Sequence, residues 1–410
     1  MKPRTPAPLR EREFRLLFLG RTISIAGTAI APIALAFAVL DLTDSLSALG
    51  LVLAARMVPQ IVFLLLGGIW ADRLPRHKVM VGSNLTSGAA QALMALLLVL
   101  NLAELWQLVA LQIVAGAASA FFFPASSGIV PQTVPRALLQ PANALLRLSL
   151  NSTQIAGAAA GGILVAAAGP GWALAFDAAT FFVAAGVLAL MRLPRAERVH
   201  GRNVLADLRV GWREFSSRTW LWAVVIGFGF LNATHQGTSG VLGPAIARDE
   251  LGGAAAWGLI LAGQAGGLVL GGLILLRYRP QRPLLVGCAA VSLMAPGLLL
   301  LALHAPVLVI AAAFLLTGIG MELFGVLWDV SLQQHVPQET LSRVYSYDAV
   351  GSFVLIPLGL VLAGPIAHAV GREATLAGAA ALVLLVSAAM VSVRDVQRLE
   401  RADAGATSSP

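Results

Sequence analysis

Apolar stretches long enough to cross a membrane follow one another along the whole chain. A spanning helix needs about 20 predominantly apolar residues. The pattern predicts twelve such helices, at 15–40, 46–70, 79–101, 104–130, 142–168, 172–192, 220–246, 254–276, 284–303, 306–329, 345–369 and 373–392. The first run follows five basic residues, as a secretory signal would, but it is too long for a signal core and no A-x-A-like site closes it. We therefore predict an all-α integral membrane protein that keeps this helix.

The composition agrees with a membrane location. Hydrophobic residues make up 58% of the 410 residues and charged residues 12%, against about 45–50% and about 25% in soluble domains. The formal net charge is +8, but the basic residues lie in short separated groups rather than in one patch, so we expect no nucleic-acid partner. The one cysteine, Cys288, excludes a disulfide or a thiolate metal site within one chain.

Sequence motifs of enzymes and of nucleotide hydrolysis do not occur. The chain has neither G-x-x-x-x-G-K-[ST] nor H-E-x-x-H. We therefore expect a protein that is not an enzyme, needs no cofactor, and takes its energy from an ion gradient or from the gradient of its own substrate.

Lysine and arginine fall mostly on one side of the predicted helices. With the amino terminus in the cytoplasm, the segments on that side carry 23 of the 28 Lys and Arg, and the opposite loops carry only Arg248 and Arg372. Basic loops stay cytoplasmic, so we expect both termini there. The scarcity of lysine and the abundance of alanine and glycine are typical of a GC-rich bacterial genome, which predicts a bacterial plasma membrane.

Two segments recur at one spacing. The run GGIWADRLPRHK at 67–78 is echoed by GGLILLRYRPQR at 271–282, and VPQ at 130–132 is echoed at 336–338. Both offsets are about 205 residues, which indicates an internal repeat. We predict two pseudo-symmetric six-helix halves, 1–192 and 220–392, with a cytoplasmic linker at 193–219 and a cytoplasmic tail at 393–410. The linker contains an amphipathic stretch near 204–215, expected either to lie on the anionic inner leaflet or to be a solvated helix.

Six plus six helices, the long centre and the 67–78 loop together resemble the major facilitator superfamily, and most of all its bacterial drug and siderophore exporter-like members. In that superfamily the loop has the form G-x-x-x-D-[RK]-x-G-[RK]-[RK]. Gly68, Asp72, Arg73 and Arg76 match it, whereas Pro75 replaces the expected glycine. The resemblance implies a conformational latch in which Asp72 meets the start of the eleventh helix. The arginines alone are also explained as topology anchors.

Two further positions bear on the direction and coupling of transport. Exporter-type members resemble G-P-x-x-G-G in the fifth helix, and Gly157, Gly161 and Gly162 keep the glycine spacing without the proline. Glycines at this spacing also serve close helix packing in general. In the fourth helix the family often has an arginine where this chain has Gln112, which weakens the case for proton coupling at that point.

Charged residues at membrane depth are functional candidates. Arg56 lies near the middle of its span, and Arg21 lies about 9 Å from the inner edge, where its side chain either reaches a cavity or snorkels to water. Glu322 lies about 10 Å from the inner edge of the tenth span. It is our first choice for a proton-coupling residue, with an ion pair to an arginine as the alternative.

The seventh predicted span carries a polar run at mid-depth, which is costly in lipid. Asn232, His235 and Gln236 are therefore expected to face a central cavity and meet substrate or proton. For His235 the alternative is a histidine whose hydrogen bonds are satisfied within the protein. Three acidic residues near span ends, Asp177, Asp329 and Asp348, are interpreted as caps or interhelical partners. Of the successive rings at 121–123, at most two are expected to face a drug pocket, because neighbouring positions point in different directions.

These features predict a secondary transporter that exports an amphipathic small molecule in exchange for protons by alternating access. The expected partners are that small molecule, protons and membrane lipids, and the expected state is a monomer. The alternatives are an importer or uniporter of a small metabolite on the same fold and a non-transporting membrane sensor.

Overall fold

The structure is a computed structural model, and it describes all residues except 1–6, 72–74, 136–137, 194–208, 210–211 and 402–410. In this part of the chain every regular element is helical and no strand occurs. The all-α prediction is therefore confirmed.

The first six long helices follow the predicted spans closely. They are α1 (Arg12–Thr43), α2 (Leu46–Ala71), α3 (Arg76–Val99), α4 (Leu105–Ile129), α5 (Leu139–Ala168) and α6 (Pro170–Ala189). A short 3-10 turn, Ala7–Arg10, precedes α1, and another, Val130–Gln132, follows α4.

The later helices are interrupted more often. They are α8 (Thr219–Gly237), α9 (Gly243–Ile246), α10 (Ala254–Arg277), α11 (Pro283–Ala290), α12 (Ala295–Ala302), α13 (Val307–His335), α14 (Gln338–Phe353), α15 (Ile356–Val370), α16 (Arg372–Ser392) and α17 (Arg394–Arg398). A 3-10 turn, Val291–Met294, joins α11 to α12 just before Pro296. Proline lacks an amide donor and its ring crowds the preceding turn, which explains the irregularity.

Eleven helices of the described residues are long and apolar enough to cross a membrane. The predicted span 220–246 is not among the eleven. It begins with the 19 residues of α8, which end in the polar run, and it continues through π-helical segments at Thr238–Leu242 and Ala247–Leu251 on either side of α9. The count of twelve is thus not confirmed as such. π-helical insertions are rare and occur often at functional sites.

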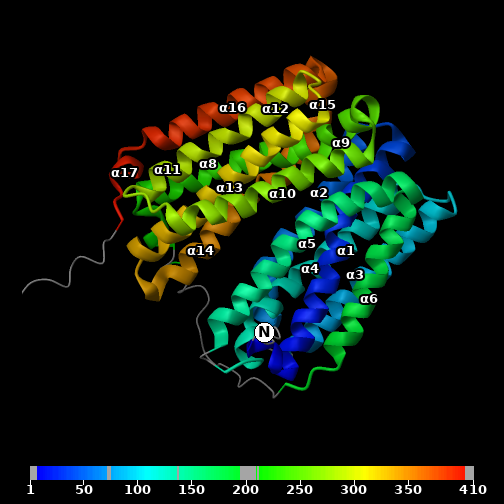
Figure 1. The fold of residues 1–410 in the computed structure, drawn as a ribbon, viewed down its shortest axis with the longest axis horizontal. Coiled ribbons are helices and arrows are strands. Elements are labelled where there is room, and N and C mark those ends of the chain that lie inside the picture. Colours follow the sequence, from blue (N-terminus) through cyan, green and yellow to red (C-terminus); the bar gives the residue numbers. More distant parts are fainter. Residues whose placement is uncertain (1–6, 72–74, 136–137, 194–208, 210–211, 402–410) are drawn as a thin grey trace, which may run out of the picture. The chain divides into compact units, whose positions relative to one another are not determined.

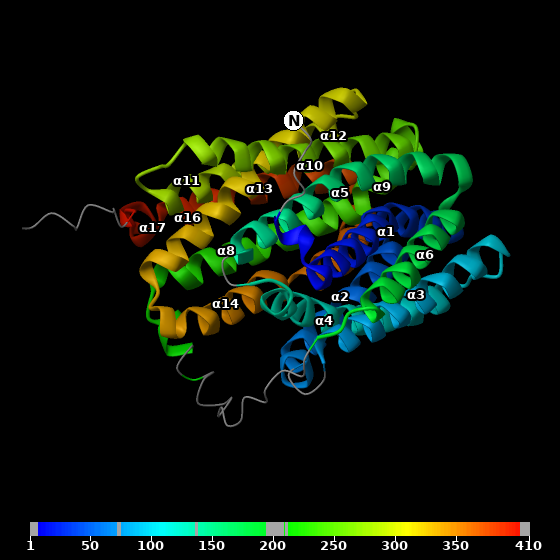
Figure 2. The same cartoon turned by 60° about the horizontal axis from the view of Figure 1, so that its bottom comes forward.

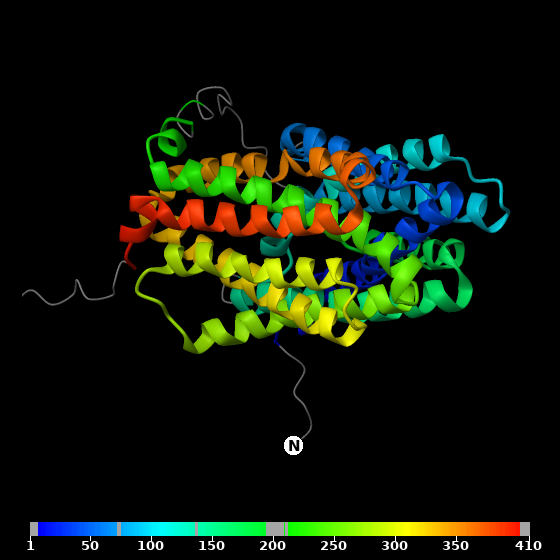
Figure 3. The same ribbon diagram turned by 90° about the horizontal axis from the view of Figure 1, so that it is seen from above.

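The helices pack into two compact units. The first comprises residues 1–199, 239–262 and 360–365, and the second comprises 200–238, 263–359 and 366–410. In the first unit α6 packs against both α1 and α3 (Figures 1 and 2). In the second, α16 packs against α8 and α12 (Figure 3).

The interior of the first unit includes a cluster of fully buried side chains from α1, α3 and α4, among them Phe14, Leu17, Met80 and Ile129. Many large apolar side chains remain exposed; Leu303 and Leu308, for example, are 74% and 73% exposed. A soluble monomer rarely exposes so much apolar surface, whereas lipid would cover it in a membrane protein.

Candidate functional site

A fully buried carboxylate lies inside the first unit. Asp177 is the eighth of the 20 residues of α6 and is 0% exposed. The Nε2 of Gln91, on α3, donates a hydrogen bond of 2.6 Å to Asp177 Oδ2. The predicted interhelical pairing is therefore confirmed. The predicted place near a span end is wrong, because Asp177 lies well inside the helix.

Buried polar side chains lie on α3 and on two helices packed against it, α4 and α6, and we call them the α3–α6 polar cluster. The cluster consists of Asn84, Ser87 and Gln91 of α3, Gln112 of α4, and Asp177 and Thr180 of α6, all buried. On α3 its members recur at helical spacing and so share one face. Gln112 contacts α3 through its Nε2, which lies 3.8 Å from Met94 Sδ.

Several polar atoms of the cluster have no hydrogen-bond partner. They are Asp177 Oδ1, Gln91 Oε1, Gln112 Oε1 and Asn84 Nδ2. Buried polar atoms are nearly always paired, because desolvation without a hydrogen bond costs about 1–3 kcal/mol. Three of these four atoms are acceptors, so the cluster is short of hydrogen-bond donors.

Arg56 is a charged residue that acts electrostatically on this cluster. It is half-buried on α2, and its guanidinium donates to Ser119 Oγ of α4 at 3.5 Å. Its positive charge attracts Asp177, but no ion pair joins these two described residues. The helices α2 and α4 approach closely here, since a Cβ on Gly116 would lie 2.1 Å from Arg56 O.

The two arginines nearer the predicted inner edge differ from each other. Arg21 is half-buried on α1, and its Nε is buried with no hydrogen-bond partner. Arg147 is exposed on α5. Arg21 therefore stays a candidate for a buried functional charge.

The polar run predicted in the seventh span lies at the end of α8. Asn232 is buried and donates to Ser352 O of α14 at 3.0 Å. His235 Nε2 lies 3.1 Å from Gln264 Nε2 of α10. The amide can donate in this contact only when the imidazole nitrogen carries no proton. Gln236 is half-buried next to His235. The structure thus brings Asn232 and His235 into interhelical contacts within the second unit.

Glu322 is half-buried on α13 and faces α10. A Cβ on Gly271 would lie 2.8 Å from Glu322 Cβ, and one on Gly272 would lie 3.6 Å from Glu322 Oε1. Glu322, Gly271 and Gly272 all belong to the second unit. The glycines of the second repeat copy therefore provide the space in which this carboxylate lies.

Two further carboxylates join α13 to α14. Trp328 Nε1 and Ser352 Oγ donate to Asp348 at 3.0 Å each, and Tyr345 Oη donates to Asp329 Oδ1 at 3.0 Å. These contacts confirm the interhelical interpretation of both acids. Rings from α8 and α13 pack beside them, with Phe228 and Phe324 stacked at 4.3 Å between centroids. The geometry favours helix packing at this place.

Only part of the predicted latch lies in the described chain. Asp72 and Arg73 are outside the described residues, and Gly68 is placed only as backbone of α2. Arg76 is half-buried as the first residue of α3. In the linker, 194–208 and 210–211 are also outside, but Trp212 contacts Tyr347 of α14, with ring centroids 5.5 Å apart.

The three glycines of α5 lie at close helix contacts of the first unit. A Cβ on Gly157 would lie 2.4 Å from Ala29 Cβ of α1, and one on Gly161 would lie 3.2 Å from Ile30 Cα. On Gly162 it would lie 2.5 Å from Ala254 O of α10. The α5 glycines thus serve two different neighbours, α1 and the start of α10.

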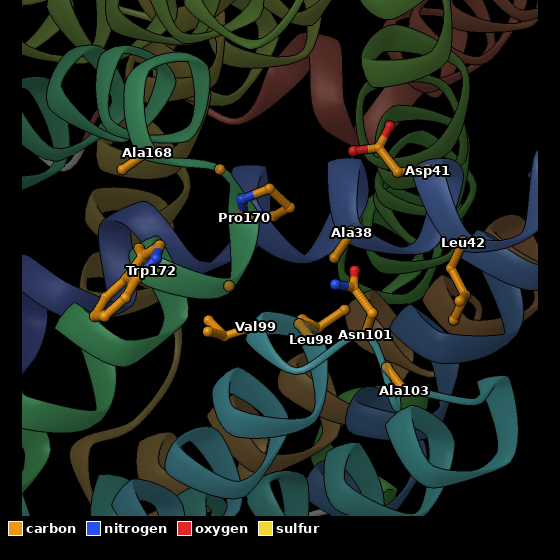
Figure 4. Close-up of a pocket in the computed structure, with 12 residues that line it drawn as sticks. Ala38, Asp41, Leu42, Leu98, Val99, Asn101, Ala103, Ala168, Pro170 and Trp172 are labelled. Carbon is orange, nitrogen blue, oxygen red and sulfur yellow. The ribbon is translucent and has the colours of Figure 1, made fainter.

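A pocket of about 430 Å³ opens where α1 and α3 end and α6 begins (Figure 4). Its wall combines apolar side chains, including Leu98 and Trp172, with two polar ones, Asp41 and Asn101. The figure shows Asp41 at the rim, on α1. The sequence pattern does not predict this pocket, because the ends of helices that are far apart in the chain form most of it.

A charged contact lies at the same end of α1. Arg248 donates to Leu40 O at 2.7 Å, to Asp249 Oδ1 at 2.9 Å and to the carboxylate of Asp44. Burial would lower the pKa of Arg248, but the hydrogen bonds and charges of Asp44 and Asp249 outweigh it and raise the pKa. We call Arg248 and its three partners the Arg248 clasp. Sequence reasoning treated Arg248 only as a loop charge.

Comparisons with known proteins cover nearly the whole chain. The chain is 21% identical to macrolide efflux protein A of Streptococcus pyogenes over 395 residues, which are 95% of this chain and 97% of that protein. It is 26% identical to the multidrug efflux pump Tap of Mycolicibacterium fortuitum over 405 residues, 94% and 97% of the two chains.

Solved structures share the fold. The nucleoside transporter NupG matches with a TM-score of 0.71 at 13% identity, over 92% of this chain and 98% of that one. A bacterial homologue of the human lysosomal transporter Spinster matches with a TM-score of 0.69 at 17% identity, over 95% and 97%. The sequence profile of the transmembrane secretion effectors matches residues 4–409. The chain therefore belongs to the transmembrane secretion effector family of major facilitator transporters.

Proposed function

We propose that this transporter exports an amphipathic small molecule and takes up protons in exchange. The observation that carries the proposal is the similarity to two efflux pumps over at least 94% of the chain. The shared fold of the solved structures supports a transporter, and it does not indicate a direction, because NupG is named as a nucleoside transporter.

The second unit supplies the residues that we propose contact substrate. Asn232, His235 and Gln236 place amide and imidazole groups among apolar helices. Such groups orient a largely apolar ligand by a few hydrogen bonds. Glu322 supplies a carboxylate that can exchange a proton, and Arg21 and Arg56 supply positive charge in the first unit.

Alternating access is proposed to depend on the loop between α2 and α3. Gly68, Asp72, Arg73 and Arg76 are the proposed latch, and the glycines of α5 allow close packing of moving helices. We propose a monomer in the bacterial plasma membrane with both termini in the cytoplasm, as the basic loops indicate.

Susceptibility testing of an efflux-deficient bacterium examines this function directly. Cells that express the chain are exposed to a diverse toxin panel that includes macrolides, with and without a protonophore. We expect protection against some amphipathic members, and we expect Asp72→Asn, Glu322→Gln or the protonophore to abolish it. Glu104→Gln, at the exposed start of α4, is the matched control and should keep protection.

The opposite results have definite meanings. Normal expression with no protection, together with uptake of a panel member, would support an importer or uniporter and refute export. Protection that survives the protonophore would refute proton coupling.

A further inference from the structure

The α3–α6 polar cluster carries an inference that deepens this proposed function and rests on it. We propose that Asp177 is a proton-binding site, whose Oδ1 takes up a proton inside the packed helices of the first unit.

The first argument is the balance of donors and acceptors. Asp177 Oδ2 accepts from Gln91 Nε2, whereas Asp177 Oδ1 and Gln91 Oε1 have no partner. The neighbouring Thr180 hydroxyl is already used, because it donates to Asp177 O at 2.7 Å. One added proton turns Oδ1 from an acceptor into a donor. It therefore supplies the kind of group that this side of the cluster lacks.

The second argument is burial. Asp177 and Gln91 are 0% and 1% exposed, and Oδ1 faces the backbone of α1, since a Cβ on Gly27 would lie 2.5 Å from it. Taking an unpaired carboxylate out of water is costly, and a group in such a place tends to become neutral. Proton uptake removes this charge without moving a helix.

The third argument concerns the charges that face Asp177 from the packed helices. No ionisable residue occurs at 22–40 of α1, at 79–99 of α3 or at 148–168 of α5. In α6, Asp177 is the one ionisable residue. The positive charge that acts on it is Arg56 of α2, which attracts it without an ion pair. No ion pair among the described residues therefore fixes Asp177 in one charge state, and the nearest help from a positive charge comes from another helix.

Infrared difference spectroscopy can detect the proton itself, which matters because a bound water would also supply a donor to Oδ1. The purified full-length protein in lipid is compared between alkaline and acidic buffer in H₂O and D₂O. We expect a C=O band of a buried carboxylic acid that shifts in D₂O and disappears in Asp177→Asn. Asparagine keeps the size and can still accept from Gln91. The matched control Asp348→Asn, another hydrogen-bonded acid, should keep the band.

Transport supplies the second readout. In proteoliposomes with an internal pH dye, we expect Asp177→Asn to lose substrate-driven proton flux while substrate exchange at equal pH continues. A band that keeps its full intensity in Asp177→Asn and in the double variant Asp177→Asn/Glu322→Gln, or one that disappears in Glu322→Gln alone, overturns the assignment. If wild-type protein shows the band but no substrate moves protons, the proposed exchange function fails and the proton site remains.

Discussion

At the scale of single residues, packing between α1 and α6 leaves no room for a side chain at position 27, which explains the glycine there. A Cβ there would lie 2.1 Å from Thr180 Oγ1 and 2.9 Å from Asp177 Cα. The second of these atoms is backbone and cannot rotate away. The contact between α1 and α6 at the buried carboxylate therefore depends on the absence of a side chain.

Gly27→Ala is accordingly expected to destabilise the protein. Overpacking of a close contact costs about 1–3 kcal/mol, so thermal unfolding in detergent should begin at a lower temperature. The matched control is Gly186→Ala on the partner helix α6, where an added Cβ meets nothing within 4 Å. Equal melting temperatures for Gly27→Ala and wild type would contradict the close contact.

The residues of the α3–α6 polar cluster show where sequence reasoning ends. The spacing of Asn84, Ser87 and Gln91 on one face of α3 is visible in the sequence. Their partner on α6 is not, because a pairing across 86 positions depends on how two helices pack. Asp177 was therefore interpreted only as a cap or an interhelical partner, whereas Glu322 was preferred from depth alone.

At the scale of elements, helix positions were predictable and their interruptions were not. The predicted span 254–276 matches α10 at Ala254–Arg277 almost to the residue, because hydropathy reports helix length directly. The π-helical segments around α9 leave the apolar pattern unchanged, so hydropathy cannot reveal them. The break between α14 and α15 comes just before Pro357, where a proline signal was present in the sequence.

The Arg248 clasp joins two such elements, the end of α1 and the π-helical segment Ala247–Leu251. Asp44 is the left-handed C-cap of α1 and is 84% exposed. Exposed ion pairs contribute about 0.2–1 kcal/mol. Leu40 O already accepts from the backbone amide of Asp44 at 2.9 Å, so the bond from Arg248 adds a second donor to a carbonyl of the last helical turn.

Arg248→Ala should therefore destabilise the protein more than Asp44→Asn does. The first variant removes all three contacts, whereas the second weakens only the exposed pair. Thermal unfolding of both variants and of the double variant measures the coupling between the two residues. The coupling should shrink in high salt, since the pair is exposed to solvent. A double variant whose loss equals the sum of the single losses would show that the ion pair contributes nothing.

At the scale of the whole molecule, the two units contain different kinds of buried polar chemistry. The first holds a carboxylate, two amides with unpaired oxygens and two half-buried arginines, Arg21 and Arg56. The second holds an imidazole and two acids, Asp329 and Asp348, that accept hydrogen bonds from neutral donors. Proton binding is proposed for a carboxylate in each unit, Asp177 and Glu322. Single variants at the two positions therefore test which unit carries the coupled proton.

The orientation of the molecule in the membrane is open to a direct test, because the chain has one cysteine and it is buried. Cys288 is 0% exposed, so an impermeant maleimide should leave the wild-type protein unlabelled. Asn101, in the loop between α3 and α4, and Gln281, in the loop between α10 and α11, are exposed. The distribution of basic residues places the first loop outside and the second inside. We expect Asn101→Cys to be labelled in intact cells and Gln281→Cys only after permeabilisation. The reverse pattern would place both termini outside. It would also invert the proposed orientation of both units in the membrane.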